Sequence, residues 1–308
     1  MRGWKRYHSP VSIDEALDLL ASYDGQARVV AGGTDLLLDL MHGSHPPVEA
    51  LVDVTHISTL DAITEKDGWI VIGAAVTHNQ IVHEPLLAEV ATCLVESCGV
   101  VGGPQVRNVG TLGGNVAHAL PAGDGTTSLV TLDAQAEIAQ GGERRWVPIR
   151  EMYQGPGRSL IDPTRDLLLR VRFRPAGAGQ GTAFKRIMRP QGVALPVLGC
   201  GVWVSLTPGG EIDAARVCVA PVAPTPVRIT AVEEMLARRA VASEDALAAV
   251  LDDAAHTMRE AIKPRTSAFR ATADYRMEMA QVLLRRALPL AIQRARTGEA
   301  IPEGVGLQ

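Results

Sequence analysis

Two short glycine-rich segments constrain this chain more than any other feature of its sequence. The first reads Ala31-Gly32-Gly33-Thr34-Asp35 and the second reads Thr111-Leu112-Gly113-Gly114-Asn115. Adjacent glycines lack a Cβ, so the main chain can pass close to a ligand and reach positive φ. Successive N–H groups in such segments can line an anion-binding hollow. Together the segments predict one extended ligand with a charged centre, such as a dinucleotide pyrophosphate, although either segment alone could equally be a plain turn.

The common nucleotide-binding motifs are missing. The sequence has no G-x-G-x-x-G pattern and no G-x-x-x-x-G-K-[ST] pattern. Gly199-Cys200-Gly201 begins the first pattern, but Val204 stands where its last glycine belongs. A Rossmann fold or a P-loop fold is therefore disfavoured.

Length and composition limit the class of protein. The 308 residues suffice for two or three domains, and 46% of them are hydrophobic, which allows a large core. Only 4% are aromatic and the net charge is −4, so we expect no nucleic-acid partner. We find no secretory signal and no apolar run long enough to span a bilayer, so we expect a cytoplasmic protein.

The four cysteines do not form a metal-binding pattern. They are Cys93, Cys98, Cys200 and Cys218, with no C-x-x-C and no histidine pair at ligand spacing beside them. We expect them to be reduced and to pack as small apolar side chains. The sequence thus predicts no metal ion and no iron–sulfur cluster in this chain.

The first half of the chain reads as an α+β arrangement without a regular βαβ rhythm. Ser12 with Glu15 and Thr77 with Gln80 are two capping-box pairs; they predict a helix that ends near Ser22 and a helical stretch that ends near Cys98. The expected strands cover residues 28–31, 51–54, 69–72, 134–140 and 144–149, the last two forming a hairpin around a glycine pair.

The composition changes to Pro, Ala and Gly over residues 175–181, where we expect a domain boundary. Beyond it, strands are expected at 182–188, 197–206 and 214–220, and helices at 230–240, 243–262 and 273–296. Thr230 and Glu233 form a third capping-box pair. This order predicts a three-stranded antiparallel sheet backed by helices.

Several further motifs follow one another along nearly the whole chain. The second glycine segment has the specific lead-in Gln105-Val106-Arg107-Asn108-Val109-Gly110. The other segments are 30–36, Pro121-Ala122-Gly123-Asp124, Ala183-Phe184-Lys185-Arg186, 219–226 and Asp274-Tyr275-Arg276. In this order they resemble the FAD-binding medium subunit of molybdenum hydroxylases, the group of aerobic carbon monoxide dehydrogenase and xanthine dehydrogenase, and the resemblance runs nearly end to end.

The resemblance implies a fold. It implies a two-part FAD-binding domain of the vanillyl-alcohol-oxidase (PCMH) type over residues 1–176, with its subdomains dividing near 57–60. A small C-terminal domain of the carbon monoxide dehydrogenase flavoprotein type would cover 177–296, with its three-stranded antiparallel sheet and helices. Residues 297–308 would form a tail.

The resemblance also implies a noncovalent FAD site. Main-chain N–H groups of 31–36 would meet the pyrophosphate and 111–115 would approach it from the other side. Asp124 would hydrogen-bond ribose or ribityl hydroxyls, and Lys185 would lie near the isoalloxazine ring. Val101 stands where relatives have an aromatic side chain, and Val193 or a neighbour would have to cover the flavin. The full predicted set is Val30, Ala31, Gly32, Gly33, Thr34, Asp35, Leu36, Val101, Gly110, Thr111, Gly113, Gly114, Asn115, Asp124, Leu168 and Lys185.

The implied function is electron transfer, with no catalytic residue and no metal ligand of the chain's own. A large subunit with a molybdenum cofactor would hydroxylate a substrate. Two-iron two-sulfur clusters of a small subunit would pass the electrons to FAD here and on to an external acceptor, in a dimer of heterotrimers. His118, which follows the second segment, reads as an ordinary loop histidine.

Two other functions stay open. One is a stand-alone flavin reductase of related fold, like the enzyme acting on UDP-N-acetylenolpyruvylglucosamine; its Asn-x-Gly-Ala-Tyr-Gly run is absent here. The other is a binding subunit that has lost its flavin, against which the intact glycines of both segments argue.

Overall fold

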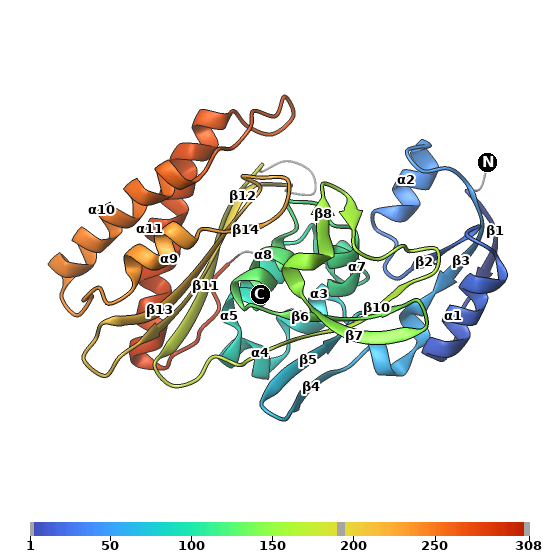
Figure 1. Cartoon of the computed structure of the whole chain (residues 1–308), viewed down its shortest axis with the longest axis horizontal. Helices are drawn as coiled ribbons and strands as arrows, with labels where there is room; N and C mark the ends of the chain where they lie inside the picture. The colour runs from blue at the N-terminus through green and yellow to red at the C-terminus, as the bar shows by residue number, and fades with distance from the viewer. Residues whose placement is uncertain (1–2, 190–194, 305–308) are drawn as a thin grey trace.

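The computed structural model describes residues 3–189 and 195–304. Three units, each built on its own main sheet, follow one another along the long axis of the molecule (Figure 1). The N-terminal unit lies at one end, the C-terminal helices lie at the other, and the helices α3 to α8 lie between them. None of the helices in the described ranges combines the length and apolarity needed to cross a lipid bilayer.

The first unit is a small parallel sheet with strand order β1-β3-β2. Its elements are β1 (Trp4–His8), α1 (Ile13–Ser22), β2 (Ala27–Val30), α2 (Leu36–His42) and β3 (Val48–Asp53). The strands and helices alternate regularly here, so the expectation that this half lacks a βαβ rhythm is wrong for the first 53 residues. The alternation begins with β1, a strand that was not predicted from the sequence.

The predicted helix start at Ser12 is confirmed. Its hydroxyl accepts a hydrogen bond from the N–H of Glu15 at 3.1 Å. The Glu15 carboxylate, however, accepts from the N–H of Val11 and not from that of Ser12. The pair at Thr77 and Gln80 forms the complete reciprocal box.

The middle unit is a five-stranded antiparallel sheet with the order β4-β5-β10-β6-β7. Its strands are β4 (Ile63–Lys66), β5 (Trp69–Gly73), β6 (Gln135–Gln140), β7 (Glu143–Pro148) and β10 (Leu167–Phe173), with a small side hairpin of β8 (Tyr153–Gly155) and β9 (Arg158–Ser159). Its helices are α3 (His78–Val82), α4 (Pro85–Val90), α5 (Thr92–Gly99), α6 (Pro104–Arg107), α7 (Leu112–Ala117) and α8 (Asp124–Thr131). The helical stretch expected up to Cys98 is therefore three helices, because α3 ends before Pro85, which begins α4.

The C-terminal unit is an antiparallel sheet with the order β11-β12-β13-β14. Its elements are β11 (Gln180–Met188), β12 (Pro196–Leu206), β13 (Ile212–Ala220), β14 (Val227–Arg228), α9 (Thr230–Leu236), α10 (Glu244–Ala261) and α11 (Ala273–Thr297). The three long strands and the two long helices confirm the prediction. The fourth strand has two residues, too few to produce an alternating pattern.

The prediction of a third capping box, at Thr230 and Glu233, is wrong. Ile229 caps α9, and its side chain cannot accept a hydrogen bond. The Glu233 carboxylate instead accepts from the N–H of Val217 on β13 and pairs with Arg228 on β14. The helix also ends at Leu236, earlier than expected.

The sheet of the C-terminal unit has one face against α11 and the other against α5 and α8 of the middle unit. Ala183 belongs to the apolar cluster that includes α11, and its neighbour Phe184 belongs to the cluster of the middle unit. Successive side chains of a strand point to opposite faces. The next residues of β11 therefore also point alternately toward α11 and toward the middle unit.

A buried ion pair joins these units. The Arg294 guanidinium on α11 donates to the Glu96 carboxylate on α5 at 2.7 Å, and the two side chains are 3% and 1% exposed. Arg294 also donates to the carbonyl of Thr182 on β11. The Glu96 carboxylate accepts from the N–H groups of Phe184 and Glu303, so the pair ties together α5, β11, α11 and the C-terminal segment.

We expect Arg294→Met to lower the free energy of unfolding by about 3–5 kcal/mol, because it leaves the Glu96 carboxylate buried without its counter-charge. Urea unfolding measures this loss. Arg285→Met is the matched control on the same helix, because Arg285 pairs with Asp252 at the surface; its loss should be below about 1 kcal/mol. The double variant Glu96→Gln/Arg294→Met should recover part of the loss, and a double variant no better than Arg294→Met would contradict this account.

Candidate functional site

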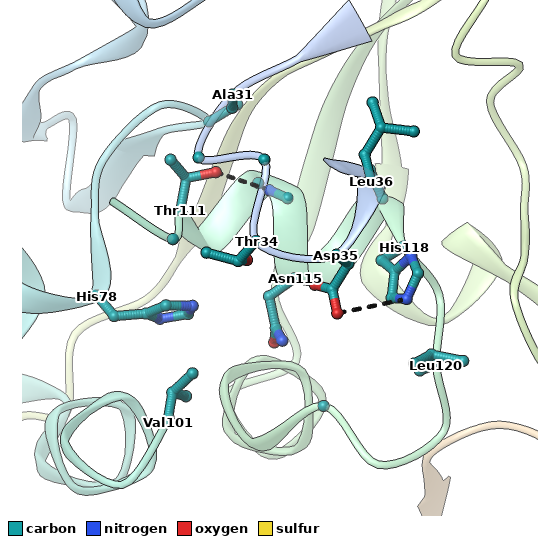
Figure 2. A pocket seen from close by; sticks show the side chains of 18 of the residues that line it. Ala31, Thr34, Asp35, Leu36, His78, Val101, Thr111, Asn115, His118 and Leu120 are labelled. Atoms are coloured by element: carbon teal, nitrogen blue, oxygen red, sulfur yellow. Dashed lines mark hydrogen bonds and ion pairs between the residues drawn. The ribbon is translucent and has the colours of Figure 1, made fainter. Parts of the chain in front are cut away.

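A cavity of about 560 Å³ lies where the three units meet. The first unit contributes residues 28–36, the middle unit contributes the second glycine segment and the start of α8, and the C-terminal unit contributes Arg186, Leu195, Pro196 and Arg270. Figure 2 shows Asn115 beneath the first loop, with His78 and Val101 on one side and His118 and Leu120 on the other. Both glycine segments therefore reach one cavity, as the sequence predicts for a single extended ligand.

The first loop presents its amides. It leaves β2 after Val30 and turns at Gly33, which has φ of +68°, before α2 begins at Leu36. Gly33 accepts from Leu37 through its carbonyl, but no N–H of residues 32–36 donates to a described residue. Backbone donors without partners are rare in folded proteins unless water or a ligand accepts from them. This run of N–H groups fits an anionic group in the cavity.

The second loop does not present its amides. The N–H groups of Leu112 and Gly113 donate to the carbonyls of Val76 and Ala74, and those of Gly114 and Asn115 donate to the hydroxyl and the carbonyl of Thr111. What this loop offers the cavity is the Thr111 hydroxyl and the Asn115 side chain. Asn115 Oδ1 accepts from the N–H of Thr126 at 3.2 Å, while its amide nitrogen donates to no described residue. The first loop thus offers the cavity main-chain N–H groups, whereas the second offers side-chain groups. The sequence had predicted main-chain N–H groups from both loops.

The glycines of the two loops serve different purposes. A Cβ at Gly32 would overlap the carbonyl of Val109, and one at Gly113 would overlap the carbonyl of Ala74. These glycines are needed for close packing of protein backbone. A Cβ at Gly114 would meet only the hydroxyl of Thr111, at 3.0 Å, so Gly114 leaves bare backbone beside the cavity.

Two histidines line the cavity. His118 Nε2 lies 3.9 Å from a carboxylate oxygen of Asp35 in the first loop (Figure 2). His78 is 2% exposed, and its Nδ1 lies 3.4 Å from the thiol sulfur of Cys98. Burial, aided by the positive charge of Arg107, lowers the pKa of His78 to about 4. His78 is therefore neutral at neutral pH and adds no charge to this side of the cavity.

A buried ion pair closes the cavity toward the C-terminal unit. The Arg186 guanidinium on β11 donates to the Asp124 carboxylate at the start of α8 at 2.5 Å, and both side chains are almost fully buried. Burial raises the pKa of Asp124 to about 7, while the charges of Arg186 and Arg270 oppose that rise. Arg270 lines the cavity as well and donates to the carbonyl of Pro196 at 3.3 Å.

All but one of the sequence-predicted residues line this cavity. The exception is Lys185, whose Nζ pairs with the Glu303 carboxylate at 2.7 Å. Side chains two residues apart on a strand lie on the same face of the sheet. Lys185 therefore shares the face of Ala183, toward α11 and the C-terminal segment. Arg186 shares the face of Phe184, toward the cavity. Sequence reasoning missed Arg186, and only the register of β11 distinguishes it from its neighbour. Val193 lies outside the described residues.

Leu168 lies in the cavity wall together with Leu167. Their pairing with Ala139 and Ile138 of β6 is regular, so the two side chains point to opposite faces of the sheet. Leu167 belongs to the apolar cluster of the first unit and Leu168 to that of the middle unit. The cavity therefore reaches the strand where these two clusters meet.

The four cysteines are buried and form no disulfide, and burial raises the pKa of each thiol. Between Gly3 and Arg189 and between Leu195 and Gly304, no group of three or more His, Cys, Asp or Glu side chains is arranged to hold a metal ion.

Two protein families match consecutive parts of the chain. The FAD binding domain of molybdopterin dehydrogenases matches residues 3–175, and the C-terminal domain of carbon monoxide dehydrogenase flavoproteins matches residues 182–291. The chain belongs to the FAD-binding subunits of molybdopterin dehydrogenases.

Relatives of this FAD-binding subunit are similar over nearly their whole length. The carbon monoxide dehydrogenase medium chain of Afipia carboxidovorans is 32% identical over 290 residues, which cover 94% of this chain and 97% of that one. The xanthine dehydrogenase FAD-binding subunit of Escherichia coli is 29% identical over 292 residues, with 94% and 96% covered. The solved carbon monoxide dehydrogenase of Hydrogenophaga pseudoflava superposes with a TM-score of 0.86 at 29% identity, covering 96% of this chain and 99% of that one. The predicted fold class is thereby confirmed.

We expect Gly32→Ala to destabilise this FAD-binding subunit by about 1–3 kcal/mol, because its methyl group would overlap the Val109 carbonyl. Gly114→Ala is the control, since its methyl group meets only the Thr111 hydroxyl and alanine favours the helix. Thermal unfolding of both variants measures the difference. Equal melting temperatures would show that the two loops do not touch as described.

Proposed function

We propose that this chain is the FAD-binding electron-transfer subunit of a molybdenum-containing hydroxylase. The observation that carries the proposal is the run of N–H groups of residues 32–36, which donate to no described residue and line the same cavity as the bare backbone of Gly114. A dinucleotide pyrophosphate is an anion that suits such a run of N–H groups. The near full-length similarity to dehydrogenase FAD subunits supports the same function.

The residues present fit FAD as follows. The amides of residues 32–36 would bind the pyrophosphate from one side, and the Thr111 hydroxyl and the Asn115 amide nitrogen would donate from the other. Val101 and Leu168 would supply apolar contact. The residues proposed to bind FAD are therefore those predicted from the sequence, with the exception of Lys185, whose place Arg186 takes in the cavity wall.

Bound FAD supplies the chemistry, the reversible uptake of two electrons. The chain's own residues bind and orient it. The buried apolar side chains along the wall, among them Leu167 and Leu168, exclude water from the cavity. We propose no catalytic acid or base in this chain.

The partners follow from the function. We propose that an iron–sulfur small subunit delivers electrons to this chain and that a large subunit with the molybdenum cofactor removes them from the substrate. We further propose that the complex is a dimer of heterotrimers in the cytoplasm. The relatives named above are subunits of dehydrogenases, which favours this function over the stand-alone flavin reductase.

We propose the domain division 1–176, 177–296 and 297–308, with the first domain divided near residues 57–60. The first family match ends at residue 175 and the second begins at residue 182, which supports the boundary between the first two domains. The short helical turns over 54–56 and 58–60, between the parallel sheet and β4, support the division within the first domain.

We expect the purified chain to bind FAD noncovalently and to be yellow, with the FAD released on denaturation. Gly114→Val should weaken FAD binding at least about tenfold, because it places a branched side chain where bare backbone lines the cavity. Quenching of FAD fluorescence on titration measures the affinity.

The control for that variant is Gly209→Val, in a turn where an added Cβ meets only the Thr207 hydroxyl at 3.7 Å. It should leave the affinity unchanged. A wild-type chain that cannot be loaded with FAD would overturn the proposed function, and unchanged affinity in Gly114→Val would overturn the loop assignment.

A further inference from the structure

We propose that His78 is a further ligand-binding residue, whose Nε2–H donates to a phosphate oxygen of the bound dinucleotide. The inference rests on the proposed function and adds to it a residue outside the set predicted from the sequence. Three observations carry it. They are the place of the ring in the cavity, the partner of its Nδ1 atom, and the uncharged state that its surroundings impose.

The backbone holds His78 close to the first loop. Its N–H donates to the carbonyl of Gly110 at 3.0 Å, which fixes the start of α3 beside the segment that precedes α7. A Cβ at Gly110 would stand 3.5 Å from Cδ2 of His78 and 3.8 Å from Cγ2 of Thr34, so both side chains lie near one point. Figure 2 shows the ring extending into the cavity below Thr34. His78 is therefore a neighbour of the run of N–H groups of residues 32–36.

The buried thiol of Cys98 fixes the tautomer of the ring. Nδ1 of His78 lies 3.4 Å from the sulfur of Cys98. The thiol keeps its proton because burial raises its pKa, and an imidazole nitrogen is a better acceptor than a sulfur atom. The thiol therefore donates to Nδ1, and the proton of the neutral ring is on Nε2. Nε2 contacts no polar group of a described residue, so its N–H can donate to a ligand.

His78 offers this donor without a charge. Burial and the positive charge of Arg107 lower its pKa to about 4, so the ring is neutral at neutral pH. It would bind an anion as the main-chain amides do, through the dipole of an N–H group. A hydrogen bond to a charged acceptor is shorter and stronger than one between two neutral groups. A phosphate oxygen beside those amides is thus the acceptor that gains most from this donor.

The other histidine of the cavity does not share these features. His118 is 33% exposed on its side chain, and its Nε2 lies 3.9 Å from a carboxylate oxygen of Asp35. A carboxylate at this place repels a phosphate group. The donor that suits the diphosphate is therefore His78.

The test is the affinity of the full chain for FAD and for ADP, which carries a diphosphate without the flavin. His78→Leu should weaken both by the same factor, at least about tenfold, because it removes a donor to a charged group. His78→Gln should keep most of the affinity, since its amide nitrogen can take the place of Nε2. Quenching of FAD fluorescence measures the first affinity, and displacement of FAD measures the second.

His83→Leu is the matched control, because His83 follows the same helix and its Nδ1 bonds to the carbonyl of Asn79 away from the cavity. It should change neither affinity.

Nitrogen NMR of the wild-type chain, labelled in histidine, keeps the inference testable if His78→Leu folds poorly. The signal lost in His78→Gln identifies the ring. It should carry its proton on Nε2 at neutral pH, and this proton should shift when FAD binds. Cys98 is a positioning residue in this account. Cys98→Ala should therefore give a mixture of the two tautomers, whereas Cys98→Ser, which keeps a donor, should not.

Unchanged FAD affinity in His78→Leu, or a proton found on Nδ1, would overturn this inference, while FAD binding by the wild-type chain would leave the proposed function standing. A loss confined to FAD would contradict the contact with the diphosphate. A wild-type chain that cannot be loaded with FAD would overturn both.

Discussion

The contact between two bare stretches of backbone is the constraint on which the cavity depends. Gly32 of the first loop lies so close to the carbonyl of Val109 that no side chain fits between them. This contact joins the parallel sheet of the first unit to the segment that precedes α7 in the middle unit. Without it, the amides of the first loop, which donate to no residue in the described ranges, and the polar side chains of the second loop would not line one cavity.

The part of the cavity wall that the C-terminal unit contributes depends on buried charge. Among the described residues, two ion pairs buried on both sides join the C-terminal unit to the middle unit: Arg294 with Glu96, away from the cavity, and Arg186 with Asp124, in its wall. Buried pairs contribute little net stability relative to apolar packing, but they are costly to break singly and thus specify one arrangement. The first pair orients the unit, and the second places a charge where the ligand binds.

Much of the fold could be predicted from local patterns. The hydroxyl of Ser12 and the reciprocal pair of Thr77 and Gln80 cap helices where predicted, since capping depends on residues three apart in the sequence. Thr230 and Glu233 have the same spacing, yet Glu233 bonds to β13 and β14 because the fold brings those strands within its reach. The strand β10, central in its sheet, was missed because it begins with three successive leucines, which lack the alternation of a half-buried strand.

The two glycine segments, most of the helices and strands, and every predicted site residue except Lys185 could be found from residue types and short spacings alone. How those parts act depends on contacts between segments that are distant in the sequence. The tertiary structure engages the amides of residues 112–115 with backbone carbonyls and the Thr111 hydroxyl, whereas those of 32–36 donate to no residue that the structure describes. It also turns Arg186 toward the cavity and Lys185 away from it, because the face a strand residue occupies depends on which layers pack against the sheet.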